Sequence, residues 1–139
     1  MLAEYTAADW SATTPLPPPL SPRTGAASLV HGLTALALAS EAASVRAEDT
    51  VLVHAVAGGL GLWLAQVCKA RGAVVIGTTS SAAKAAVARA RGGADHVVLY
   101  REEDVVERVR EITGGRGVHA IFDGIGRDTC VFASKLSLR

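Results

Sequence analysis

Three closely spaced glycines are the first residues of this chain whose spacing could do chemistry. Gly58, Gly59 and Gly61 follow a short β-branched run at 50–56 and precede an apolar helical pattern. A strand, a glycine turn and a helix in this order let backbone N–H groups at the helix start approach a pyrophosphate closely. Val56 stands where a GxGxxG pattern has its first glycine, so the match is incomplete. The turn at 56–61 nevertheless has the strand before it and the helix after it that dinucleotide binding needs.

Two other interpretations of this turn are weaker. The glycines could serve only to let the strand and the helix pack together, but their position between a strand pattern and a helix pattern favours nucleotide binding. A P-loop is excluded because no Gly-Lys-Ser or Gly-Lys-Thr sequence follows the glycines. A dinucleotide site is therefore the better interpretation.

The residues that follow the next strand pattern indicate which dinucleotide would bind. Enzymes that use NAD generally carry Asp or Glu here, where the carboxylate binds the ribose 2′-hydroxyl and would repel a 2′-phosphate. The segment 77–84 contains no acid and has Ser80, Ser81 and Lys84 instead. Ser80 can donate a hydrogen bond to a phosphate and Lys84 can supply positive charge, whereas Ser81 alone is better explained as a helix cap. The sequence therefore favours NADP(H) over NAD(H).

Alternating strand and helix patterns must position these residues. The expected strands cover residues 50–56, 73–77, 96–100 and 118–123, and the expected helices between them cover 60–70, 81–91 and 102–112. This alternation predicts an α/β fold in which a parallel sheet is covered by helices. With about four strands, the sheet would be an incomplete Rossmann-type doubly wound sheet.

The first 23 residues differ from the rest of the chain. All five prolines lie between Pro15 and Pro22, which excludes a regular helix or a central strand there. From Ser21 or Thr24 to about Val45, alanine and leucine at helical spacing predict a helix. We therefore expect a Pro-rich lead-in at 1–23 and an α/β domain at 24–139 that begins with this helix.

Composition limits the classes of protein to consider. The 139 residues are 50% hydrophobic, which suits one domain with a packed core, and the formal charge of +1 argues against nucleic acid or an anionic membrane as partner. The apolar stretch 51–65 is interrupted by His54 and three glycines, so it does not predict a membrane span. The start of the chain resembles no secretory signal, and Cys68 and Cys130 lie outside any CxxC motif. We therefore expect a cytoplasmic location.

No metal site and no catalytic acid or base is predicted. The four histidines, His31, His54, His96 and His119, lack metal-ligand spacing. The last three fall on or beside expected strands, where a packed or surface histidine is the commoner explanation.

Five segments of the chain match one family in the same order. They are 51–61 (VLVHAVAGGLG), 76–78 (IGT), 100–106 (YREEDVV), 112–115 (ITGG) and 122–126 (FDGIG). Together they resemble the zeta-crystallin-like quinone oxidoreductases, zinc-free members of the medium-chain dehydrogenase/reductase superfamily. Residues 3–5 and 16–17 resemble the end of that family's catalytic domain, and 32–35 (GLTA) resembles its GLTA helix. The resemblance implies that 1–23 is a remnant of the catalytic domain and linker, and that 24–139 is a partial NADP-binding domain.

The resemblance also implies an activity and further site residues. Members of this family transfer hydride from NADPH to a quinone or a similar conjugated carbonyl, largely by placing the nicotinamide beside the acceptor. By position, the pyrophosphate contacts would come from Gly58, Gly59, Leu60 and Gly61. Ser80, Lys84 and Tyr100 would hold the 2′-phosphate, and Thr34 would lie near the nicotinamide. Tyr100 is one residue further from Lys84 than the family pattern expects, so a tyrosine that only caps a strand edge is the alternative.

Two other functions stay open at this point. An enoyl reductase of the same superfamily shares the glycine turn, although the segment 100–104 (YREED) favours the quinone branch. A non-catalytic NADPH- or RNA-binding protein is the second alternative, because the family includes lens crystallins and members that bind AU-rich RNA. The nearly neutral charge argues against strong RNA affinity.

Apart from the tail at 1–23, the family's substrate-facing domain has no counterpart in these residues, and neither have its later strands. This leaves open whether the chain is active alone. A sheet that ends at its fourth strand would expose an edge and apolar faces. We therefore expect poor solubility or association with a partner, a second copy of the chain included.

Overall fold

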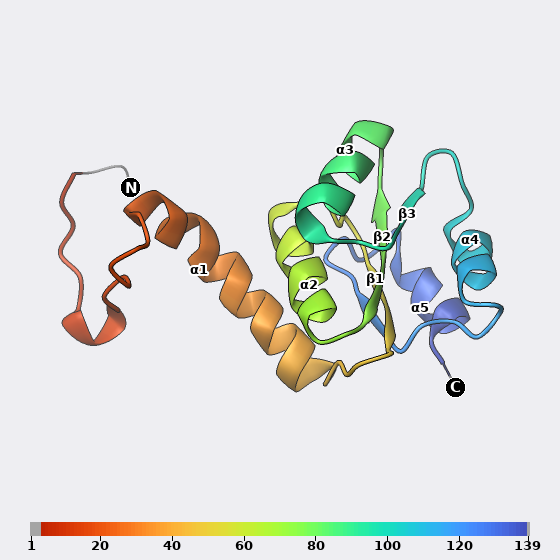
Figure 1. Cartoon of the computed structure of the whole chain (residues 1–139), viewed down its shortest axis with the longest axis horizontal. Coiled ribbons are helices and arrows are strands. Elements are labelled where there is room, and N and C mark those ends of the chain that lie inside the picture. The colour runs from red at the N-terminus through yellow and green to blue at the C-terminus, as the bar shows by residue number, and fades with distance from the viewer. Residues whose placement is uncertain (1–3, 139) are drawn as a thin grey trace.

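A four-stranded parallel sheet forms the centre of the molecule in the computed structural model, which describes residues 4–138 (Figure 1). The order across the sheet is β3-β2-β1-β4, and each neighbouring pair is parallel. In the register, Val51 lies opposite both Val75 and Ala120. The strands are β1 Thr50–Val53, β2 Val74–Thr79, β3 His96–Leu99 and β4 Ala120–Phe122. The predicted α/β Rossmann-type sheet of about four strands is therefore confirmed.

The helices begin and end where local chemistry satisfies their backbone groups. Ser21 caps α1 by accepting a hydrogen bond from the Thr24 N–H, and Asp104 caps α4 by accepting from Glu107. Gly93, with φ of +71°, ends the helical segment before β3. The helices are α1 Pro22–Ala37 with a π-helical end Leu38–Ala42, α2 Gly59–Ala70, α3 Ala82–Val87 with a π-helical end Ala88–Gly92, α4 Val105–Ile112 and α5 Cys130–Leu136.

Alternating strand residues build two apolar layers, one on each face of the sheet. Val51, Val53 and Val75 pack with Leu64, Ala65 and Cys68 of α2 and with the end of α1. Leu52, Ile76 and Val98 face the other way and pack with Val105, Val109 and Leu136 from α4 and α5. Each layer removes valine, leucine and isoleucine side chains from water, at roughly 25 cal/mol per Å² of apolar surface. The two layers hold the carboxyl ends of the strands at one common edge.

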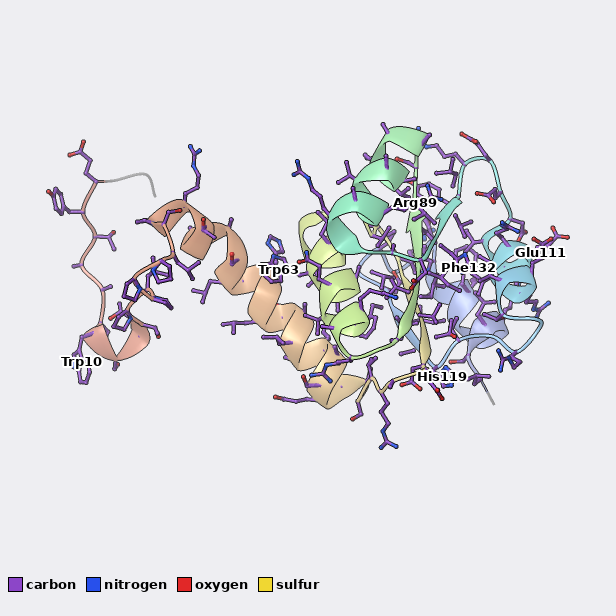
Figure 2. All side chains as sticks on the ribbon, in the orientation of Figure 1. Trp10, Trp63, Arg89, Glu111, His119 and Phe132 are labelled. Carbon is purple, nitrogen blue, oxygen red and sulfur yellow. The ribbon has the colours of Figure 1, made fainter. Side chains whose placement is uncertain are left out.

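The lead-in lies at the end of α1 that points away from the sheet (Figure 1). Its described part has one short 3-10 helix, Trp10–Ala12, and is otherwise irregular, as the prolines predict. Residues 1–3 lie outside the described part, so the structure describes only residues 4 and 5 of the segment 3–5 that resembles the family. Trp10 is exposed there, whereas Trp63 lies between α1 and α2 (Figure 2).

Exposed apolar side chains gather on α1. Leu29, Val30, Leu33 and Leu36 are between 47% and 68% exposed. At the outer edge of β4, the Val118 N–H donates to Leu136 and the Leu138 N–H donates to Val118. These two hydrogen bonds partly cover the backbone beside β4, whereas the apolar side chains of α1 stay exposed. The exposed apolar surface on α1 is therefore larger than that at the edge of the sheet, and association of the chain with a partner stays a prediction. No helix within residues 4–138 is both long enough and apolar enough to cross a membrane.

Candidate dinucleotide-binding site

A pocket of about 180 Å³ opens at the carboxyl edge of the sheet. Four of the predicted site residues line it together: Gly58, Ser80, Lys84 and Tyr100. They come from three different connections, yet they meet because the carboxyl ends of parallel strands share one edge. The remaining lining residues are Ala55, Ala57, Thr79 and Ile125.

The N-terminus of α2 presents free N–H groups at this edge. Gly58 is the N-cap residue and has no side chain to cap the helix, and the first helical bond runs from the Leu62 N–H to the Gly58 carbonyl at 2.9 Å. The N–H groups of Gly59, Leu60 and Gly61 therefore lack an intrahelical acceptor, whereas the Gly58 N–H donates to the Ala55 carbonyl at 2.8 Å. Together with the partial positive charge of the helix end, they favour an anion.

Packing explains part of the glycine pattern. A Cβ at Gly61 would lie 2.5 Å from the Ala55 carbonyl oxygen and 2.7 Å from Val56 Cα, so this position must be glycine for α2 to start so close to the turn. A Cβ at Gly59 would lie 3.0 Å from His31 Cε1. Gly58 is exposed and a Cβ there would meet only Ala55, at 3.2 Å. The packing interpretation thus holds for Gly61, while Gly58 lines the pocket.

Ser80 and Lys84 form a polar pair on the opposite wall. Lys84 Nζ donates a hydrogen bond to Ser80 Oγ at 3.4 Å. Ser81 caps α3, as predicted, by accepting from the Lys84 N–H at 3.5 Å. This cap fixes the first turn of α3 and keeps Lys84 beside the end of β2.

Tyr100 reaches the pocket in spite of the extra residue between it and Lys84. Its N–H donates to the Thr79 carbonyl at 3.1 Å, and its side chain is 47% exposed. The π-helical segment Ala88–Gly92 lies within this stretch, and a π-helical turn takes up one residue more than an α-helical turn. The insertion is therefore absorbed before β3.

Thr34 and His31 of α1 do not line this pocket. Thr34 is exposed on α1 and is not among the residues that line the pocket. One helical turn earlier, His31 lies against Gly59 in the predicted turn. Sequence reasoning missed His31, although its spacing of three from Thr34 would have placed both on one helix face.

The side chains of His54 and Asp123 make hydrogen bonds next to the pocket. His54, 5% exposed, makes a 2.9 Å hydrogen bond from Nδ1 to Thr78 Oγ1, and burial lowers its pKa against the opposing charge of Asp123. Burial raises the pKa of Asp123, but hydrogen bonds from Thr129, Gly126 and Ile125 outweigh this and lower it. Asp123 thereby holds the loop that brings Ile125 to the pocket.

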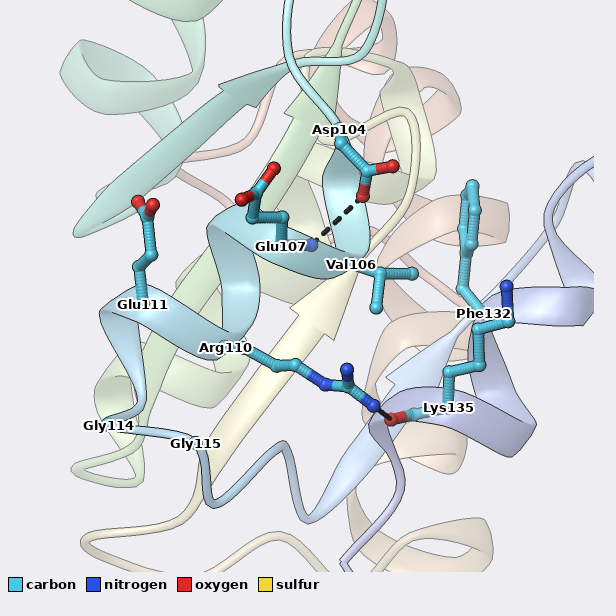
Figure 3. Close-up of a pocket in the computed structure, with 9 residues that line it drawn as sticks. All are labelled: Asp104, Val106, Glu107, Arg110, Glu111, Gly114, Gly115, Phe132 and Lys135. Carbon is cyan, nitrogen blue, oxygen red and sulfur yellow. Dashed lines mark hydrogen bonds between the residues drawn. The ribbon is translucent and has the colours of Figure 1, made fainter.

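A larger pocket, of about 900 Å³, lies elsewhere, between α4 and α5 (Figure 3). Charged side chains of both signs line it, and Arg110 donates there to the Lys135 carbonyl oxygen at 3.3 Å. It contains no predicted site residue. Because polar groups and a helix N-terminus converge at the smaller pocket, that pocket is the better candidate. Within residues 4–138, no group of three or more His, Cys, Asp or Glu residues could hold a metal ion.

Known proteins resemble this chain in sequence and in fold. A family model described as zinc-binding dehydrogenase matches residues 59–138. Quinone oxidoreductase 1 of Escherichia coli strain K12 is 46% identical over 114 residues, which is 82% of this chain and 35% of that protein. The structure of Escherichia coli quinone oxidoreductase complexed with NADPH matches with a TM-score of 0.85 and 43% identity, covering 89% of this chain and 38% of that one.

A mycobacterial protein complexed with NADPH matches with a TM-score of 0.86 and 43% identity, covering 95% of this chain and 41% of that one. The chain therefore spans between 35% and 41% of the length of these relatives. Both the sequence and the fold confirm the resemblance to quinone oxidoreductases of the medium-chain dehydrogenase/reductase superfamily. The chain belongs to the zinc-binding dehydrogenase family.

Proposed function

We propose that this chain binds NADPH and supports the reduction of a quinone, or of a similar conjugated carbonyl, in the cytoplasm. One observation carries the proposal: Gly58, the N-cap residue of α2, lines one pocket together with the Ser80 and Lys84 pair, and the free N–H groups of α2 begin at the next residue. NADPH carries two anionic groups, a pyrophosphate and a 2′-phosphate. The N-terminus of α2 would bind the first, and Ser80 with Lys84 would bind the second. The relatives that are complexed with NADPH support the same cofactor.

The residues present fit that cofactor. The first turn of α2 would hold the pyrophosphate through the N–H groups of Gly59, Leu60 and Gly61, and the exposed backbone of Gly58 would contact it. Ser80, Lys84 and Tyr100 would surround the 2′-phosphate. The segment 77–84, at the end of β2, contains no acid that would repel this phosphate.

The chain's own contribution is binding and orientation. NADPH, when bound, supplies the hydride. The free N–H groups and Lys84 would fix the two phosphates, and the side chains of Tyr100 and Ile125 would narrow the pocket around the ribose. Thr34 stays our proposal for a residue near the nicotinamide, and the lead-in at 1–23 stays our proposal for a remnant of the catalytic domain.

Calorimetric titration of the chain with NADPH and, separately, with NADH tests the proposal. We expect saturable binding with a clear preference for NADPH, because only NADPH carries the 2′-phosphate that Lys84 would pair with. Equal affinity for the two cofactors would contradict the 2′-phosphate assignment. Absence of binding to either cofactor would overturn the proposed function.

A further inference from the structure

His31 of α1 lies at the first turn of α2. The two helices pack closely: a Cβ at Gly32 would lie 3.7 Å from the Trp63 ring, and a Cβ at Gly59 would lie 3.0 Å from His31 Cε1 and 3.1 Å from Nε2. Gly59 is the first residue of α2. The imidazole ring therefore rests on the backbone of the turn that presents free N–H groups.

The ring nitrogens of His31 are available to a ligand. The side-chain hydrogen bonds and the ion pair of histidines in the described part of the chain belong to His54 and His119. His31 itself is exposed. The partial positive charge of the helix N-terminus favours an anion at this place. A ring N–H of His31, whose ring rests on Gly59, would be a further donor to an anion held there.

We propose that His31 is a further binding residue for the dinucleotide and that a ring N–H donates a hydrogen bond to its pyrophosphate. This inference rests on the proposed function and extends the site from α2 to α1. Gly59 then has two roles, since its lack of a side chain gives the anion access to the helix and lets the ring approach. A hydrogen bond to a charged acceptor stabilises more than one between neutral groups.

Two variants separate the hydrogen bond from the packing of the ring. His31→Phe keeps a ring against Gly59 and removes both nitrogens, whereas His31→Gln keeps a donor. His96→Gln is the control, because His96 is exposed at the first residue of β3, the strand end opposite to the pocket. Since His31 is exposed, we expect all three variants to unfold at the same temperature as the unchanged chain.

Titrations use NADPH and 2′-AMP, which contains the adenosine and the 2′-phosphate but no pyrophosphate. We expect His31→Phe to weaken NADPH binding about tenfold, the effect of roughly one charge-assisted hydrogen bond, and to leave 2′-AMP binding unchanged. His31→Gln should stay within about threefold of the unchanged chain for NADPH.

Two results would overturn the inference while the proposed function stands. One is that His31→Phe binds NADPH as tightly as the unchanged chain. The other is that His31→Phe weakens NADPH and 2′-AMP equally, because that would show a general disturbance of the pocket. If the unchanged chain binds neither ligand, the proposed function fails, and this inference fails with it.

Discussion

Nδ1 of His54 lies 2.9 Å from Oγ1 of Thr78, and this hydrogen bond joins the carboxyl ends of β1 and β2 next to the candidate pocket. Nε2 of the same ring is buried and has no hydrogen-bond partner in the described part of the chain. Burial lowers the pKa of His54 more than the charge of Asp123 raises it. The ring is thus held in its neutral form.

The stability of the fold should therefore depend on the protonation of His54. In the unfolded chain, the imidazole takes up a proton near its ordinary pKa of about 6.5, but in the folded chain it does so only at lower pH. The stabilisation from neutral His54 is present above this ordinary value and is lost as the pH falls through it toward the lower folded pKa. We expect the melting temperature of the unchanged chain to fall more steeply between pH 7 and pH 5 than that of His54→Gln, which cannot titrate.

Thermal unfolding followed by circular dichroism across this pH range measures the difference. Each chain is compared with its own melting temperature at pH 8, so that the difference in slope is separated from any difference in overall stability. Parallel curves for the unchanged chain and His54→Gln would show that His54 carries no proton linkage.

The strand and helix order could be predicted from the sequence, because β1, β2 and β3 are rich in β-branched residues and each is followed by a turn. The strand ends could not: β1 was expected over 50–56 but ends at Val53. The chain turns after Val53, where Ala55 adopts a positive φ of 50° that nothing in its residue type indicates. Helix α5 was not predicted, because its seven residues carry too short an apolar pattern to distinguish it from a loop.

The candidate site, too, could be predicted from the sequence only in part. Gly58, Ser80 and Lys84 could be predicted, because each follows a strand and parallel strands share their carboxyl edge. The contact of His31 with Gly59 could not, because it depends on how α1 crosses α2, with Gly32 against Trp63. Helix crossing depends on side-chain packing between two elements, which the pattern of either one alone does not contain.

Reversal of the charge at Lys84 should separate the two cofactors. Lys84 lines the pocket beside Ser80, where the 2′-phosphate of NADPH would lie. We expect Lys84→Glu to weaken NADPH by at least about tenfold, since a favourable ion pair becomes a repulsive one, and to change NADH by less than about threefold. Arg89→Glu is the matched control: Arg89 is exposed in the π-helical segment and does not line the pocket. Equal losses for NADPH and NADH would count against the 2′-phosphate assignment.

A methyl group at Gly61 should destabilise the fold. It would lie 2.5 Å from the Ala55 carbonyl oxygen and 2.7 Å from Val56 Cα, and both are backbone atoms that cannot rotate away. We expect Gly61→Ala to lower the free energy of unfolding by about 3 kcal/mol, the upper end for an overpacked site. Gly124→Ala is the control, since a Cβ there meets nothing within 4 Å and should change stability by less than about 0.5 kcal/mol. Urea unfolding measures both, and equal stabilities would show that α2 can shift away from the turn.

The reactivity of Cys68 should report on the packing of the core beneath α2, and the exposed Cys130 serves as the comparison. Cys68 is fully buried between α2 and the sheet, and burial raises the pKa of its thiol to about 11 against the weaker opposing effect of Arg71. Alkylation requires an exposed thiolate, so Cys68 should not react at pH 8 while α2 stays packed. Cys130 is exposed on α5.

Iodoacetamide at pH 8 should therefore modify one thiol of the folded chain, Cys130, and both thiols in urea. A Cys130→Ser variant should show no modification by mass spectrometry until it is unfolded. Any slow modification of Cys68 in this variant measures how often α2 opens from the sheet, because the thiol becomes accessible only in the opened state. If NADPH binds at the first turn of α2, it should slow this modification, since a ligand that binds only the packed state lowers the population of the opened one. A rate that is the same with and without saturating NADPH would place the bound cofactor away from α2.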